Sequence, residues 1–231
     1  MGYPRHYPDR AWRRGGYSDY AENRISERGY AGGNAMFALY GMLLTLVGQQ
    51  YTFKLGINPE KAGALVLGLI VLVFVGVFMM ALSDKPPVSF LGLTFIAGSF
   101  GLVLGIVEPG IAVPPLVAST SVAVVMAFAG WFLPANLYKW GSWLLGLTTA
   151  LIVVQILMPI IESYGVSAGT YQRPAWLDVA TVVLFSGWLI YDLNRARRMP
   201  RNLDTMIDNG GAIYLDWLNI YLALRNLMGD D

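Results

Sequence analysis

The chain has 231 residues, of which 55% are hydrophobic and 13% are charged. Soluble domains carry about a quarter charged residues, so this composition excludes an ordinary soluble domain and indicates a membrane protein. The net charge of +1 gives no reason to expect a polyanionic partner. The chain has no Cys, and its one His is His6, which argues against disulfides, zinc sites and His-based catalytic triads.

Residues 1–34 differ from the rest of the chain because they are rich in Arg, Tyr and Gly. Arg and Tyr side chains can bind nucleic acid or lipid headgroups. Four acidic residues, however, offset the six arginines of this segment. We therefore predict that residues 1–34 form a disordered cytoplasmic tail, and we expect no nucleic-acid partner.

Seven apolar blocks follow the tail, each long enough to cross the membrane as a helix of about 20 residues. The blocks are continuous rather than alternating, which predicts helices and excludes a barrel. Small residues in the third block predict close helix contacts there. The whole of residues 35–229 is thus expected to form one transmembrane domain. The predicted spans are Ala35–Phe53, Ala62–Leu82, Pro86–Val107, Pro109–Tyr138, Trp140–Ile161, Ala175–Asn194 and Gly210–Met228.

The basic residues predict the orientation, because Lys and Arg are enriched in cytoplasmic loops. With the N-terminus inside, twelve of the 16 basic residues fall on cytoplasmic segments. The sequence therefore predicts an integral, multi-pass protein of the cell membrane with a cytoplasmic N-terminus. The four basic residues left outside are Lys54, Lys61, Arg173 and Arg225.

Acidic residues are concentrated in the last two predicted spans. Asp178 lies near the start of the sixth span, where we expect it to stay hydrated at the interface. Asp192 lies near the end of that span, and Asp216 lies well inside the seventh. A carboxylate in hydrocarbon is costly unless it faces protein or water, so Asp192 and Asp216 are the candidate functional residues.

Asp192 and Asp216 are each twelve residues from Asp204, near the middle of the turn between these spans. Helices that leave one turn bring equidistant residues to similar depth, so we expect a close pair of carboxylates. Such a pair would share one proton, sense pH and offer oxygen ligands to a hard cation such as Ca²⁺. Alternatively, Asp192 sits among headgroups and pairs with Arg195. Asn219, about one turn beyond Asp216, is expected to support the pair.

Two stretches around these acids resemble the Bax inhibitor-1 family, also called transmembrane Bax inhibitor motif proteins. The stretch FSGWLIYDLN at residues 185–194 is similar to the family's sixth-helix motif. The stretches YLDWLNIY at 214–221 and LRNLMG at 224–229 are similar to its seventh helix, and LYKWGS at 137–142 resembles a further segment. The resemblance covers about residues 35–229. It implies an all-α membrane protein, a seven-transmembrane-helix bundle with the last helix central.

The resemblance also implies a function. It points to a prokaryotic, pH-sensitive calcium leak gated by Asp192 and Asp216, with Ca²⁺ as a permeant or transiently bound ion and no resident cofactor. In bacterial relatives a basic residue at the end of the second helix latches onto the sixth-helix carboxylate. The corresponding segment here has no Arg, which leaves Lys85 as the candidate.

Two other classes of function are compatible with the sequence. The first is a non-conducting regulator that binds other membrane proteins, such as membrane proteases or components of stress and death pathways. The second is an intramembrane aspartyl protease, whose chemistry usually needs a glycine next to the acid. Neither Asp192 nor Asp216 has a neighbouring glycine, so we expect no enzyme activity.

Overall fold

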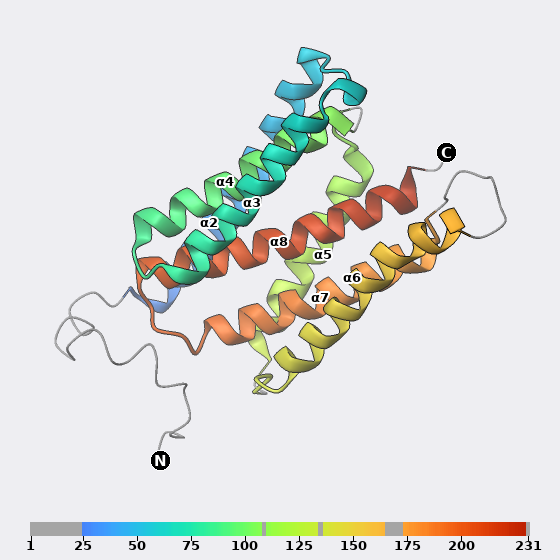
Figure 1. The fold of residues 1–231 in the computed structure, drawn as a ribbon. Coiled ribbons are helices and arrows are strands. Elements are labelled where there is room, and N and C mark those ends of the chain that lie inside the picture. The colour runs from blue at the N-terminus through green and yellow to red at the C-terminus, as the bar shows by residue number, and fades with distance from the viewer. Residues whose placement is uncertain (1–24, 108–109, 134–135, 165–172, 230–231) are drawn as a thin grey trace.

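The computed structural model describes residues 25–107, 110–133, 136–164 and 173–229, with 160–164 described by their backbone alone. Within these residues the fold is entirely helical, with seven α-helices and one short 3₁₀ helix (Figure 1). The elements are α2 (Glu27–Leu55), η1 (Pro59–Lys61), α3 (Gly63–Leu82), α4 (Pro86–Val107), α5 (Val113–Phe132), α6 (Trp140–Tyr164), α7 (Ala175–Ala196) and α8 (Leu203–Met228).

The first helix begins earlier than the apolar pattern predicted. Ser26 caps α2, because its hydroxyl accepts a hydrogen bond from the Gly29 amide at 3.1 Å. The helix ends at Gly56, whose φ of 60° places it in the left-handed region that favours glycine. Residues 27–34, which fall in the predicted tail, are therefore helical in the structure. The predicted tail up to residue 24 lies outside the described residues.

The last helix also begins earlier, at Leu203 instead of Gly210. Asn202 and Thr205 form a capping box, in which the Thr205 amide donates to the Asn202 side chain at 2.8 Å. The first two turns of α8 are polar, so hydropathy alone assigned them to the preceding loop.

Helix α8 has neighbours on several sides. In Figure 1, α8 runs between a group formed by α2, α3 and α4 and a second group formed by α6 and α7. It packs against α2, α4, α5 and α7. We call the end of the bundle at which α2, α4 and α8 begin the basal end, and the opposite end the distal end.

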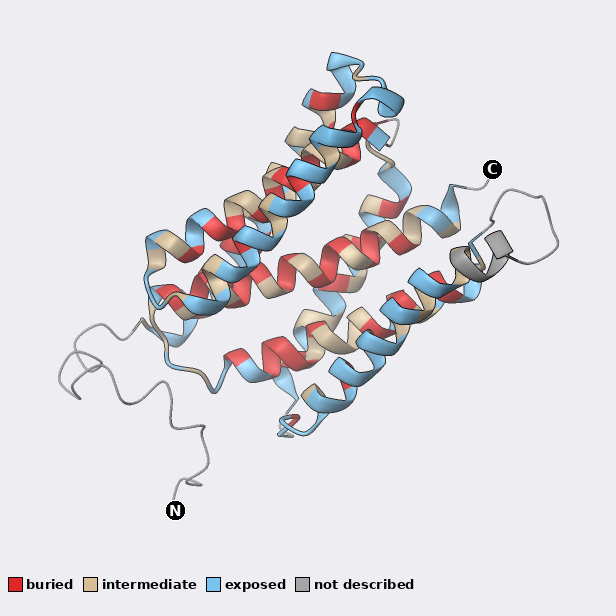
Figure 2. Cartoon of the chain, viewed as in Figure 1, coloured by how far each residue is buried: buried red, intermediate tan, exposed pale blue. Residues whose placement is uncertain are grey.

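Burial follows the same arrangement. Buried residues gather along α8, whereas α3 and α6 are largely exposed (Figure 2). The exposed side chains include many large apolar ones, as expected of surfaces that face lipid. Six helices, α2 to α7, are long and apolar enough to cross a membrane. The polar residues of α8 keep it out of that set, although most of them face other helices.

Glycines let several helices approach closely. A Cβ built on Gly76 would lie 2.5 Å from the Gly92 carbonyl, and one built on Gly92 would lie 2.6 Å from the Gly76 carbonyl. A Cβ on Gly101 would lie 2.5 Å from the Thr45 carbonyl. These contacts confirm that small residues of α4 mediate packing, on one side to α3 and on the other to α2.

Candidate functional site

The basal end of α7 holds Asp192 and is anchored to the end of α5. The Asn194 amide donates to the Leu133 carbonyl at 3.1 Å, and its oxygen accepts from the Leu137 amide at 3.4 Å. The Arg197 guanidinium also donates to the Leu133 carbonyl, at 3.3 Å. These side chains satisfy the terminal carbonyls of α5 and fix the position of α7. As a result, Asp192 is 7% exposed and held inside the bundle.

Asp216 lies near the middle of α8 and is 6% exposed. Its charge interacts with that of Asp192, so the two carboxylates lie within electrostatic range of each other. Within the part of the chain that the structure describes, no group donates a hydrogen bond to the Oδ2 atom of Asp216. Leaving a buried polar atom unsatisfied costs about 1–3 kcal/mol, and more for a charged group. The carboxylate is therefore retained at a cost in stability, which is typical of a functional position.

The sequence suggested that Asp192 and Asp216 are equally far from the turn between their helices, but in the structure their distances from it differ. Asp192 lies four residues before the end of α7, whereas Asp216 lies thirteen residues after the start of α8. At a rise of 1.5 Å per residue these offsets are about 6 Å and about 20 Å. The connection 197–202 makes up the difference between these two offsets. It does so because α8 begins further toward the basal end than the point where α7 ends (Figure 1). The start of α8 is instead level with the first turn of α4.

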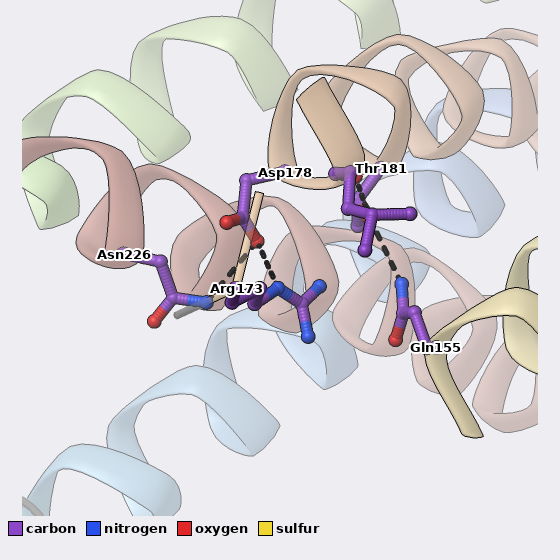
Figure 3. A network of polar contacts seen from close by, with 6 residues as sticks. Gln155, Arg173, Asp178, Thr181 and Asn226 are labelled. Atoms are coloured by element: carbon purple, nitrogen blue, oxygen red, sulfur yellow. Dashed lines mark hydrogen bonds and ion pairs between the residues drawn. The ribbon is translucent and has the colours of Figure 1, made fainter. Parts of the chain in front are cut away.

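Asp178 contrasts with Asp216. It accepts from the Arg173 guanidinium at 2.9 Å and from the Asn226 amide at 3.1 Å (Figure 3). The expectation that Asp178 stays hydrated is wrong, because it is 2% exposed. Its two partners join the distal ends of α7 and α8. Asp178 is thus a satisfied carboxylate that holds two helices together.

The basal end of α8 carries two further acids that the sequence analysis did not single out. Asp204 accepts a hydrogen bond from the Ser89 hydroxyl of α4 at 2.7 Å. Asp208, one turn later, has a buried Oδ1 atom without a protein donor, and its charge interacts with those of Asp204 and Arg195. The spacing of four residues was the available signal, since it places both acids on one face of the helix.

The structure does not bring the two predicted supporting residues to the pair. Lys85 is exposed in the turn between α3 and α4 and forms no ion pair with Asp192. The Asn219 amide donates to the Leu215 carbonyl of its own helix at 2.8 Å. A role for either residue in gating therefore stays a prediction.

Metal binding at the pair would be limited to few ligands. Within the described residues, no three His, Cys, Asp or Glu side chains gather as a set of metal ligands. Asp192 and Asp216 together offer four carboxylate oxygens, whereas Ca²⁺ takes six to eight ligands. Four oxygens are too few to complete the coordination shell of Ca²⁺ without water.

A buried polar stripe on α2 was also missed. Asn34, Thr45, Gln49 and Thr52 are each at most 2% exposed. Their spacings of 11, 4 and 3 residues place them on one face of the helix. The Thr45 hydroxyl is hydrogen-bonded to the Tyr214 hydroxyl of α8 at 2.7 Å. Because none of these residues is charged, the search for membrane-embedded charges passed over them.

Comparison with known proteins settles the family. No curated protein matches the chain. A family model described as "Inhibitor of apoptosis-promoting Bax1" matches residues 34–231, which is most of the chain and includes both aspartates. The chain therefore belongs to the Bax inhibitor-1 family.

Proposed function

We propose that this protein crosses the membrane seven times, with its N-terminus in the cytoplasm and α8 as the central seventh span. We further propose that it lets cations, chiefly Ca²⁺, leak down their gradient under the control of pH. In this proposal the protein has no enzymatic activity, and its basal end faces the cytoplasm. The excess of basic residues on the basal segments supports that orientation.

The observation that carries the proposal is the difference between the buried carboxylates. Asp178 has two donors and Asp204 has one, as a structural role requires. Asp216 has no donor on its Oδ2 atom, and its buried neighbour Asp192 adds a second negative charge. Two like charges so placed repel each other and attract a cation or a proton. A site with a purely structural role would become more stable if apolar residues replaced the two aspartates.

The chemistry of the pair links pH to helix packing. With one proton bound, the carboxyl and the carboxylate can share a hydrogen bond and hold α7 against α8. With both groups ionised, repulsion favours separation of the helices or entry of a divalent cation. A change in pH therefore alters both the affinity of the pair for cations and the contact between α7 and α8.

The test is calcium flux through the purified protein in liposomes that enclose a calcium indicator, measured at several pH values. Asp216→Asn keeps the side-chain volume but cannot titrate, so the difference in flux between pH values should shrink to within about twofold. Asp192→Asn should do the same, and the double variant should add little. The matched control is Asp178→Asn, a buried aspartate of α7 with donors of its own, which should keep the pH dependence.

Two outcomes would contradict the proposal in different ways. If the wild-type protein conducts no cations at any pH, the proposed cation leak is wrong. The alternative function, a non-conducting regulator of other membrane proteins, is then favoured. If flux occurs but Asp216→Asn responds to pH like the wild type, the protein conducts and the pair is not its sensor. Each variant must first elute as a folded species from size-exclusion chromatography.

A further inference from the structure

The buried polar stripe of α2 lies where this helix packs against α4 and α8. A Cβ on Gly210 of α8 would lie 2.9 Å from the Asn34 carbonyl, which places Asn34 at the basal crossing of the two helices. Gln49 lies fifteen residues further along α2, or about 22 Å at the rise of an α-helix. The stripe thus extends over most of a hydrocarbon core of about 30 Å.

At the distal end of the stripe, polar atoms from three segments meet. The Gln49 amide donates to the Gly110 carbonyl at 2.8 Å, and the Arg225 guanidinium of α8 donates to the same carbonyl at 3.2 Å. Tyr221 lies four residues before Arg225, on the same face of α8. The Oε1 atom of Gln49 and the hydroxyl of Tyr221 are both buried, and no described residue is hydrogen-bonded to either.

At the basal end the same situation recurs at Asn34. This side chain is 1% exposed, and neither its nitrogen nor its oxygen has a partner among residues 25–107, 110–133, 136–164 and 173–229. Its neighbour one turn before, Tyr30, is satisfied by the Asn209 amide of α8. An amide can form up to four hydrogen bonds, so Asn34 is the least satisfied polar side chain of the stripe.

The middle of the stripe is different, because its polar atoms satisfy each other. The Thr45 hydroxyl is bonded to the Tyr214 hydroxyl at 2.7 Å and donates to the Ala97 carbonyl at 3.1 Å. The ring of Tyr214 lies against Gly41, where a Cβ would come within 2.7 Å of it. This layer leaves no polar atom unpaired and separates the two ends.

We propose that the interface between α2 and α8 binds internal water at two places, one at Asn34 and one between Gln49 and Tyr221, separated by the Thr45–Tyr214 layer. Buried polar atoms without protein partners are the usual ligands of internal water. Such water satisfies the buried polar atoms of Asn34, Gln49 and Tyr221.

These sites are distinct from the aspartate pair and do not rest on the proposed function. Tyr214 and Asp216 are two residues apart, so their side chains leave α8 about 200° apart. Tyr214 is hydrogen-bonded to Thr45 of α2, whereas the charge on Asp216 interacts with that of Asp192 of α7. The α2–α8 interface is therefore a second polar zone on the other side of the same helix.

The test uses the absence of native cysteine. Single cysteines are introduced as Asn34→Cys and Gln49→Cys in the full chain in liposomes and exposed to silver ions in a chloride-free buffer. Silver is small and reacts with the thiolate, which forms only where water reaches the thiol. The thiols that remain are then counted with a fluorescent maleimide after denaturation.

Three matched controls accompany them. Ser119→Cys is equally buried, but the Ser119 hydroxyl is satisfied by the Leu116 carbonyl at 3.0 Å. Val47→Cys is on α2 but 63% exposed on the lipid side. Thr45→Cys tests the dividing layer.

Asn34→Cys and Gln49→Cys should react at least about tenfold faster than all three controls, as expected where a thiol can ionise in water. Rates equal to that of Ser119→Cys would overturn the proposal, and a fast Thr45→Cys would overturn the division into two places. Only variants that elute as folded protein are compared. The water site at Asn34 and the one at Gln49 can each be accepted or rejected from its own cysteine variant. If the wild-type protein showed no calcium flux, the expected rates of reaction with silver would not change. The two proposals can therefore fail separately.

Discussion

The contact between α2 and α8 can be tested by adding a single methyl group. A Cβ on Gly210 would lie 2.5 Å from the Cβ atom of Phe37, 2.9 Å from the Asn34 carbonyl and 3.2 Å from the Ala38 nitrogen. These three atoms belong to the backbone of α2 or are fixed to it, so no rotation of a side chain relieves the overlap. Gly210→Ala must therefore separate the two helices.

The size of the effect follows from two opposing terms. Overpacking a closely packed interface costs about 1–3 kcal/mol, and the upper end applies when the atoms in contact cannot rotate away. Replacing glycine by alanine inside a helix returns about 1 kcal/mol. We therefore expect Gly210→Ala to lower the free energy of unfolding by about 2 kcal/mol, a fall in Tm of about 4–8 °C for a chain of this size.

Two control variants separate the contact from general effects of alanine. A Cβ added to Gly146 of α6 would have no atom within 4 Å, so Gly146→Ala should raise Tm by about 2–4 °C through helix propensity alone. Gly211, next to Gly210, would meet the flexible end of Met80 at 2.4 Å, so Gly211→Ala should destabilise less than Gly210→Ala.

The assay is thermal unfolding in detergent, followed by tryptophan fluorescence and by circular dichroism. If Gly210→Ala unfolds at or above the temperature of the wild type, α2 and α8 do not cross this closely. The packing argument for the polar stripe would then fail as well.

Three shorter predictions test other parts of the structure. Asp178→Asn removes the charge that Arg173 and Asn226 bind. The free energy of unfolding should fall by about 1–2 kcal/mol in the same assay, because the Arg173 side chain is 34% exposed and can be rehydrated. No loss would mean that this network does not hold α7 to α8. Tyr214→Phe removes the bond to Thr45 and keeps the ring, so it should cost about 1 kcal/mol, and a loss above about 3 kcal/mol would contradict a single lost hydrogen bond. In intact cells, a tag fused after the last residue should be reachable from outside and one before Met1 should not, whereas labelling of both from one side would exclude seven spans.

The sequence alone determined the class of the protein and most of its helices. Five of the seven predicted spans begin within a few residues of their helices, because the length and hydropathy of a span are local properties that lipid imposes directly. The motifs around Asp192 and Asp216 also identified the family, which the match to residues 34–231 confirms. The sequence missed helix starts where polar residues precede the apolar run, at Glu27 and Leu203.

Only the tertiary structure decided how the polar residues are used. Asp178, Asp204 and Asp216 are all acids of the last two helices, and their positions along the chain do not show which of them find hydrogen-bond donors. Partners distant in sequence do so: Asp178 accepts from Asn226 and Asp204 accepts from Ser89, whereas the Oδ2 atom of Asp216 has no donor among the described residues. A hydrogen bond depends on positions in three dimensions, which hydropathy along the chain does not specify.

The polar stripe of α2 shows the same limit. Asn34 and Gln49 are neutral and scattered among apolar residues, so hydropathy along the chain does not single them out. Packing against α8 buries both and leaves atoms of each without a protein partner. The sequence thus determines which segments enter the membrane, because each segment meets the lipid by itself. Which polar groups are satisfied there depends on contacts between helices far apart in the chain, and only the folded bundle creates those contacts.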